Sequence, residues 1–421
     1  MLEPAEAVSR ILDALADVAP LAAERVALGE ALGRALAEDL AATRALPPFD
    51  NAQMDGYALC ADDARGAGTR LRVAAEIFAG GVPPQPLARG TCARVFTGAP
   101  LPPGADAVEM QEEVTRRGGV AEFRRPAERG RFVRRAGSDV AEGAVALGCG
   151  AVVDPGAVGL AAALGRADVA VHRRPRVALL ATGDELVPVG RSPGPAEIQE
   201  SNSHAIAAAC RDAGATPTLL PIARDTRASL DAALAAAEGF DALVTMGGVS
   251  VGDKDLVRQA LEAAGTELDF WRVAMRPGKP IAFGRRGRTA VFGLPGNPAS
   301  ALVTFELFVR PALRRLAGLP GTGRTVLSAR LAAPLEKPSE LTLYARARAH
   351  LERGALVVEP LRAQGSGQLT SVTGFDALAV APKGPTRLRR GSAVQAILLA
   401  APCVREAGTA AAPPERHGRR P

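Results

Sequence analysis

Two hydrophobic patterns alternate along residues 176–316. Short apolar runs rich in β-branched residues are typical of strands buried on both faces, and apolar residues at every third or fourth position are typical of amphipathic helices. Strands that alternate with helices predict an α/β domain with a doubly wound parallel sheet, whose ligands bind beyond the carboxyl ends of the strands. The predicted strands are 177–181, 218–223, 241–246, 267–273, 280–283 and 290–292. Four helices are predicted between and after them: a helix that is capped by Asn202 or Ser203 and ends at 213, a helix at 226–238, a helix that ends at 264, and a long helix that begins at 298.

The flanking regions show different patterns. Apolar positions at helical spacing predict amphipathic helices at 4–18 and 26–40, before a Pro-Pro break. Short β-like runs between Gly and Pro turns predict a β-rich insert, and similar runs after residue 325 predict a small sheet or barrel. The predicted domains are a helical and extended linking domain (1–46 with 140–174), the β-rich insert (47–139), the α/β domain (175–324), a C-terminal β domain (325–403) and a disordered tail (404–421).

Composition narrows the class of protein. The net charge is +6 and the pI is near 9.4, but the basic residues are dispersed and form no basic helix, so nucleic acid is not a predicted partner. The five cysteines are widely spaced without a C-x-x-C pair, which argues against a disulfide framework or a zinc site and for a reducing compartment. Three charged residues and a proline interrupt the most apolar stretch, residues 144–171, so no membrane span is predicted. We therefore expect a soluble, cytoplasmic protein.

One loop has the features of an anion site. The run D-A-L-V-T-M-G-G-V-S-V-G-D-K-D at 241–255 predicts a buried strand, a glycine loop and the start of a helix. Its glycines permit backbone conformations that a Cβ would forbid, and a helix N-terminus offers free N–H groups and the positive end of its dipole. Because Asp253 and Asp255 lie in the same loop, we expect a divalent cation between these acids and a bound phosphate.

Acidic residues follow three of the predicted strands, at Glu185, Asp225 and Asp255. The carboxyl ends of neighbouring parallel strands meet at one edge of a sheet, so these carboxylates are expected to converge. Several carboxylates beside an anion loop suit Mg²⁺, which binds carboxylates together with substrate phosphates. The alternative is that the acids cap the following helices, although Glu185 and Asp255 lie one and two residues beyond the best capping positions.

A proline-stiffened loop, W-R-V-A-M-R-P-G-K-P, carries three cations, Arg272, Arg276 and Lys279. A rigid loop loses little freedom on binding and suits a polyanion, and a solvated basic loop is the alternative. A second loop, G-L-P-G-N-P, leads into a helix with Asn297 as its N-cap and a proline at its first position. The four histidines are scattered, and no Ser–His–Asp or Cys–His set is credible.

Six short motifs follow one another between residues 48 and 298: P-F-D-N-A-Q-M-D-G-Y-A, F-T-G-A-P-L-P, A-T-G-D-E-L, G-G-V-S-V-G-D-K-D, R-P-G-K-P and G-L-P-G-N-P. In order and spacing they resemble the MoeA family, to which the E domain of gephyrin belongs. The resemblance that they carry extends over about residues 5–400. The resemblance implies a molybdopterin molybdotransferase that takes adenylylated molybdopterin and molybdate, cleaves the pyrophosphate with Mg²⁺, inserts molybdenum and releases AMP. It also implies a MogA-like α/β domain, transient contacts with other proteins of molybdenum cofactor biosynthesis, and a homodimer whose site lies between the α/β domain of one subunit and the insert of the other.

The resemblance also implies roles for individual residues. It implies catalytic roles for Asp55 and Thr97 in the insert and for Lys279, Glu185, Asp225 and Asp255 in the α/β domain, with these last three acids as the Mg²⁺ ligands. The positions that it assigns to binding of the pterin, the phosphates or molybdate are Gly247, Gly248, Ser250, Gly252, Arg272, Arg276, Pro295, Gly296, Asn297, Arg134, Asp139, Arg346 and Ser366. Many members have Lys where this chain has Arg272 and Arg276, so a compact ammonium is replaced there by a planar guanidinium.

Two other functions stay open on the sequence alone. The related α/β domain occurs by itself in proteins that attach AMP to molybdopterin, so an adenylyltransferase is the first alternative, although the insert and the C-terminal domain argue against it. Gephyrin also clusters receptors through this domain, so a non-catalytic molybdopterin-binding scaffold is the second. Consumption of ATP without molybdate would indicate the first, and tight pterin binding without AMP release would indicate the second.

Overall fold

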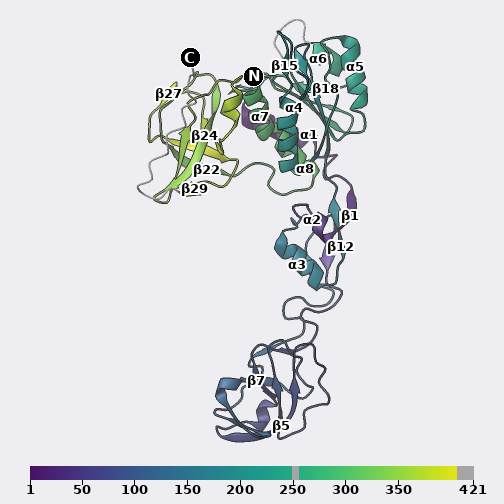
Figure 1. Cartoon of the computed structure of the whole chain (residues 1–421), viewed down its shortest axis with the longest axis vertical. Coiled ribbons are helices and arrows are strands. Elements are labelled where there is room, and N and C mark those ends of the chain that lie inside the picture. The colour runs from purple at the N-terminus through teal and green to yellow at the C-terminus, as the bar shows by residue number, and fades with distance from the viewer. Residues whose placement is uncertain (249–255, 405–421) are drawn as a thin grey trace. The chain divides into compact units, whose positions relative to one another are not determined.

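Residues 1–248 and 256–404 are described by the structure, a computed structural model (Figure 1). The chain separates into two compact units. The first comprises Met1–Glu24, Gly33–Ala35 and the chain from His172 onward, and the second comprises Arg25–Leu32 and Leu36–Val171. Within the described ranges, no helix is both long enough and apolar enough to cross a membrane.

A six-stranded sheet forms the centre of the first unit. In spatial order its strands are β16 (Thr216–Leu219), β13 (Arg176–Ala181), β17 (Ala242–Met246), β21 (Thr289–Leu294), β20 (Ala282–Arg286) and β18 (Glu267–Phe270). The first four strands run parallel, as the alternation of strands and helices predicted. β20 and β18 extend the sheet with antiparallel pairings. A short turn at Gly287 joins β20 to β21, and a turn of this length joins only antiparallel neighbours.

Helices cover both faces of this sheet (Figure 1). They are α1 (Pro4–Ala14), α4 (Asn202–Asp212), α7 (Pro298–Thr304) and α8 (Arg310–Leu316) on one face, and α5 (Arg227–Ala236) and α6 (Leu256–Ala263) on the other. Successive residues of a strand point to opposite faces, so Leu179 packs in the core beneath the first group and Leu180 in the core beneath the second. This arrangement confirms the doubly wound α/β domain.

Five strands after residue 325 close into a small barrel. They are β22 (Val326–Leu331), β24 (Thr342–Glu352), β25 (Ala355–Pro360), β26 (Ala377–Ala381) and β28 (Ala393–Leu398). β26 pairs with both β28 and β24, so the ladder β24-β25-β22-β28-β26 returns to its first strand. Small buried residues, among them Ala345, Ala347 and Ala379, pack together in its core. The predicted C-terminal β domain is thereby confirmed.

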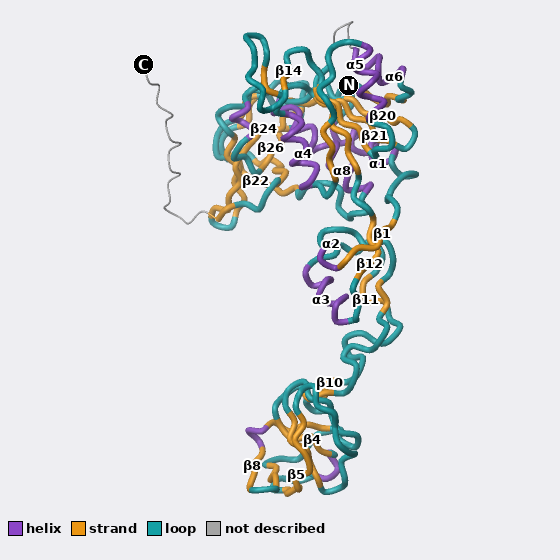
Figure 2. Tube along the Cα trace, turned by 45° about the vertical axis from the view of Figure 1, so that its right-hand side comes forward, coloured by secondary structure: helices purple, strands orange, loops and turns teal. Residues whose placement is uncertain are grey.

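The second unit contains another six-stranded sheet (Figure 2). In spatial order its strands are β7 (Ala107–Met110), β4 (Gly56–Leu59), β6 (Thr91–Val95), β5 (Thr69–Ile77), β9 (Val120–Phe123) and β8 (Val114–Arg117). Leu59 and its neighbour Ala58 belong to two different hydrophobic clusters, so both faces of the sheet are packed. β4 begins directly after Asp55 and β6 ends two residues before Thr97, so this sheet positions both predicted site residues.

The predicted helix at 26–40 is wrong. This segment contains the end of β1 (Ala23–Ala27), one turn of helix α2 (Leu28–Ala31) and the start of β2 (Leu40–Ala41). Gly33 adopts a φ of 76°, a left-handed conformation that is typical of the end of a helix. Leu36 then pairs with Val171 in an isolated bridge and packs in a cluster with α3 (Pro155–Ala163). These tertiary contacts outweigh the local helical periodicity.

Candidate functional site

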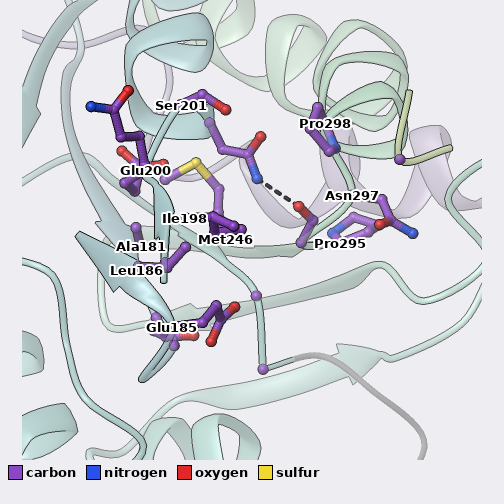
Figure 3. A pocket seen from close by; sticks show the side chains of 18 of the residues that line it. Ala181, Glu185, Leu186, Ile198, Glu200, Ser201, Met246, Pro295, Asn297 and Pro298 are labelled. Carbon is purple, nitrogen blue, oxygen red and sulfur yellow. Dashed lines mark hydrogen bonds between the residues drawn. The ribbon is translucent and has the colours of Figure 1, made fainter. Parts of the chain in front are cut away.

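A cavity of about 700 Å³ lies at the carboxyl ends of β13, β17 and β21 (Figure 3). Its lining comes from the loops after these strands, from the start of α4 and from a segment of the C-terminal domain. The predicted site residues that line it are Glu185, Asp225, Gly247, Gly248, Pro295, Gly296 and Asn297. Separate loops thus meet at the sheet edge where an α/β domain binds its ligands.

Two glycines after β17 let the chain pass very close to its neighbours. Gly247 has a φ of 98°, and a Cβ at this position would lie 2.6 Å from the backbone oxygen of Thr182. Gly248 has a φ of 66°, and its Cβ would lie 2.1 Å from Cγ2 of Val257. Only glycine suits both the backbone conformation and the space. The predicted binding and catalytic positions that follow, Ser250, Gly252 and Asp255, lie outside the described residues.

Three acidic residues line the cavity: Glu200 before α4, and the two predicted ones, Glu185 after β13 and Asp225 after β16. Burial raises the pKa of Asp225, and the negative charges of Asp184 and Glu185 raise this pKa further. The backbone N–H of Asp225 donates a hydrogen bond to the carboxylate of Asp184 at 3.1 Å. Arg224 donates to the backbone oxygens of Asp184 and Leu186, so its guanidinium is held by carbonyls. Negative charge therefore accumulates at this rim of the cavity.

The acids fit a magnesium ion that is shared with a substrate. Mg²⁺ binds one or two carboxylates and fills its other positions with water and substrate phosphates. Glu185 and Asp225 are two such carboxylates, and a cation would relieve their repulsion. In the described part of the chain, no three His, Cys, Asp or Glu residues are grouped so that they could hold a metal by themselves. The third predicted ligand, Asp255, falls in the part that the structure does not describe.

The start of α4 contributes residues that sequence analysis missed. The carboxylate of Glu200, and not the side chain of Asn202 or Ser203, accepts the hydrogen bond of a free helix N–H, that of Ser203 at 2.8 Å. The side chain of Asn202 donates instead to the backbone oxygen of Gly296 at 2.7 Å. This bond ties α4 to the loop before α7 across 94 residues. An acid two residues before the first residue of a helix was a signal for the capping role of Glu200 only, and no local pattern indicates the Asn202 contact.

A second cavity, of about 300 Å³, shares Asn297 and two prolines with the first. Its lining includes the predicted residues Arg276, Lys279 and Ser366. The amide of Asn297 donates to the hydroxyl of Ser366 at 3.1 Å, which connects the two domains at this point. β19 (Met275–Arg276) pairs in parallel with β24 and so anchors the middle of the cationic loop. A cationic cavity therefore adjoins an acidic one.

Comparison with known proteins identifies the family. The MoeA N-terminal region (domain I and II) matches residues 2–165, a probable molybdopterin binding domain matches 178–315, and the MoeA C-terminal region (domain IV) matches 328–399. Molybdopterin molybdenumtransferase 2 of Mycobacterium tuberculosis is 41% identical to this chain over 344 residues, which cover 79% of this chain and 84% of that protein. The chain belongs to the MoeA family.

Further relatives agree with this assignment to the MoeA family. The molybdopterin molybdenumtransferase of Bacillus subtilis is 36% identical over 386 residues, which cover 89% of this chain and 90% of that protein. A solved molybdopterin biosynthesis MoeA protein from Pyrococcus horikoshii superposes with a TM-score of 0.82 at 31% identity, covering 95% of this chain and 100% of that one. The resemblance carried by the six motifs is therefore confirmed, together with the multidomain fold.

Within the first unit, two described positions that the MoeA resemblance assigned to binding border neither cavity. Arg272 is exposed and is absent from both linings. Arg346 is completely buried, and burial lowers its pKa. Its Nη2 donates to the backbone oxygens of Ala363 at 3.2 Å and Gly365 at 3.1 Å. Arg346 therefore holds the loop that carries Ser366.

Four assigned positions lie in the second unit and form two pairs. Oδ1 of Asp55 accepts hydrogen bonds from the backbone N–H of Thr97 at 2.8 Å and from its hydroxyl at 2.7 Å. Both bonds favour the ionised carboxylate and lower the pKa of Asp55. Arg134 and Asp139 form an exposed ion pair. The structure thus brings Asp55 together with Thr97, which lies 42 residues later, and pairs Arg134 with Asp139.

Replacement of Thr97 by Val is expected to raise the pKa of Asp55, because valine keeps the size of threonine and removes the hydroxyl donor. A lowered acid pKa in the folded protein stabilises it above the unfolded pKa of about 3.9, and this stabilisation is lost as the pH falls through the folded value. Both proteins should begin to lose this stabilisation near the unfolded pKa of about 3.9, but the loss in Thr97→Val should be smaller and should end at a higher pH than in the wild type. An NMR titration of the Asp55 carboxyl carbon measures the effect.

Thr97→Ser is the matched control, since it keeps both donors and should leave the pKa of Asp55 where it is. If Thr97→Val also leaves this pKa unchanged, the backbone N–H alone lowers it.

Proposed function

We propose that this chain is a molybdopterin molybdotransferase of molybdenum cofactor biosynthesis. It takes molybdate and adenylylated molybdopterin, cleaves the pyrophosphate in a Mg²⁺-dependent reaction, places molybdenum on the pterin and releases AMP in the cytoplasm. The observation that carries the proposal is the pair of adjoining cavities, one acidic and one cationic. Two relatives at 41% and 36% identity that are named molybdopterin molybdenumtransferases support it.

The larger cavity is assigned to the pyrophosphate substrate. Glu185 and Asp225, with Asp255 on the sequence motif, would hold Mg²⁺, which when bound neutralises charge on phosphoryl oxygens. Gly247 and Gly248 let phosphate oxygens approach the backbone, because no side chain stands in the way. Ser250, Gly252 and the loop of Pro295, Gly296 and Asn297 complete the proposed binding set.

The smaller cavity is assigned to an oxyanion. Arg276 and Lys279 supply positive charge, and Ser366, held by Asn297, supplies a hydroxyl donor. Molybdate and the AMP phosphate are both anions of this kind, and Lys279 stabilises whichever of them occupies the cavity. Arg346 acts through the loop that it holds and is a positioning residue.

The remaining assigned positions complete the proposal. Asp55 and Thr97, with the Arg134–Asp139 pair, are assigned to the same reaction on the strength of the family motifs and of their paired geometry. Arg272 is assigned to long-range attraction of the anionic substrate, because its guanidinium is exposed. We propose that the active form is a homodimer.

Incubation with adenylylated molybdopterin, Mg²⁺ and molybdate tests the proposal, with AMP release and pterin-bound molybdenum as readouts. We expect AMP release that depends on molybdate and stops when Mg²⁺ is chelated. ATP consumption without molybdate would replace the proposal with an adenylyltransferase. Pterin binding without AMP release would replace it with a non-catalytic scaffold.

A further inference from the structure

Glu200 is an acid of the larger cavity to which the proposed reaction gives no task. Its side chain lines the cavity and is only 5% exposed. Oε1 accepts the backbone N–H of Ser203 at 2.8 Å, and no residue in the described part of the chain donates to Oε2. Oε2 is not among the fully buried side-chain atoms that lack a partner, so it stays open to the cavity, where water or a ligand can donate to it.

The fold holds this carboxylate in place. β14 (Leu186–Val187) and β15 (Ile198–Gln199) form a short parallel pair, and the backbone N–H of Glu200 continues it by donating to Val187 at 2.8 Å. α4 begins at Asn202, and the N–H of its second residue, Ser203, donates to Oε1 of Glu200. The backbone and the side chain of Glu200 are therefore both held in place by hydrogen bonds.

The surroundings of Glu200 suit a flat ring. Leu186, Ile198 and Met246 line the same cavity (Figure 3). Ile198 is 57% exposed although it is a large apolar residue, so it offers surface for a ligand to cover. Small-molecule sites combine such apolar walls with a few fixed polar groups that select the ligand.

The hydrogen-bonding edge of a pterin matches a carboxylate. In a 2-amino-4-oxopteridine the ring N3–H and the 2-amino group are neighbouring donors, so the two oxygens of one carboxylate can accept both. Oε1 of Glu200 keeps a free lone pair beside its bond to Ser203. Adenine instead places a ring acceptor, N1, beside its amino group, and this acceptor would face a carboxylate oxygen unfavourably.

We propose that Glu200 binds the 2-amino-4-oxopyrimidine edge of the pterin, and that it thereby selects the pterin half of the substrate over the adenine half for this end of the cavity. This inference rests on the proposed function, because it takes the substrate to be a pterin joined to AMP.

Separate binding titrations of 2-amino-4-oxopteridine and of AMP test the proposal in wild type and Glu200→Gln. The glutamine keeps an acceptor for Ser203 but places an NH₂ group where the pterin needs an oxygen. We expect the pterin affinity to fall about 10–100-fold, the loss typical of hydrogen bonds to a charged group, and the AMP affinity to stay within about twofold. Glu197→Gln, an acid three residues earlier that pairs with Arg191 and lines no part of the cavity, should change neither affinity.

Suppose that Glu200→Gln still releases AMP. The inference would then be overturned if pterin and AMP affinity fell equally or if neither fell, and the proposed function would still stand. Failure of the wild type to bind pterin would remove both. If Glu200→Gln does not fold, the inference can be tested with two ligands and the wild type alone. 4-Oxopteridine, which lacks the 2-amino group, should bind at least about tenfold more weakly than 2-amino-4-oxopteridine, and equal affinities would overturn the inference.

Discussion

Asp225→Asn is expected to lower the rate of molybdate-dependent AMP release by about 100-fold or more, the usual loss when one group that stabilises transition-state charge is removed. Asp225 borders the cavity beside Glu185, where a cation shared with the pyrophosphate would bind. Asparagine keeps the shape of the side chain and removes its charge. Steady-state assays at saturating substrate measure the loss.

The same change is expected to stabilise the protein slightly when no divalent cation is present. Burial and the charges of Asp184 and Glu185 raise the pKa of Asp225. An acid whose pKa is higher in the folded protein weakens stability as the pH rises through the unfolded and folded values, and asparagine removes this penalty. Because the burial of Asp225 is only partial and its side chain stays open to solvent, the gain is a few tenths of a kcal/mol, or about 1 °C in melting temperature.

Asp231→Asn is the control for both effects. Asp231 is an exposed acid on α5 that pairs with Arg227 one helical turn away, so its loss should leave activity intact and lower the melting temperature slightly. Full activity of Asp225→Asn would exclude Asp225 from the reaction. An equal rise in melting temperature on Mg²⁺ addition in wild type and Asp225→Asn would exclude it from the cation site.

Gly247→Ala is expected to destabilise the protein by about 2–5 kcal/mol and to abolish turnover. An L-residue in the left-handed region costs about 1–2 kcal/mol, and forcing extra volume into a packed site costs about 1–3 kcal/mol more. The new Cβ would lie 2.6 Å from the backbone oxygen of Thr182, which cannot rotate away as a side chain could. Denaturant unfolding and the AMP-release assay measure the two effects.

Gly239→Ala separates the clash from the backbone strain. Gly239 has a φ of 76°, and a Cβ there would meet no atom within 4 Å. It should therefore show only the conformational cost, about 1–2 kcal/mol, with normal turnover. If Gly247→Ala loses no more stability than Gly239→Ala, the close approach to Thr182 is not a constraint on this loop.

Local patterns were sufficient where local physics decides the structure. The apolar runs at 177–181 and 241–246 are β13 and β17, because strands buried on both faces must be continuously apolar. Asn297 directly precedes α7, and Pro298 is the first residue of this helix. The sequence predicted this start, because proline is favoured at the first helical position. The helix predicted at 26–40 failed because Gly33 and the pairing of Leu36 with Val171 divide that segment.

The candidate site was predicted in its loops but not in all its contacts. Glu185, Asp225 and the glycines after β17 do line one cavity, while Arg272 lines neither cavity and Arg346 supports a loop from within the core. Glu200 was missed, because nothing in the residues around it reveals that its carboxylate borders the cavity.

By itself, the sequence determined that this is a multidomain member of the MoeA family whose strand-end loops carry glycines, acids and cations. Periodicity, turn residues and motif spacing are properties of short segments, so they can be recognised without the fold. Only the tertiary structure decided which loops meet, since the bond from Asn202 to Gly296 spans 94 residues and the acidic and cationic cavities adjoin at Asn297. Such contacts depend on how parallel strands end at a common edge and on how the C-terminal barrel packs beside it, and neither is encoded in any single segment.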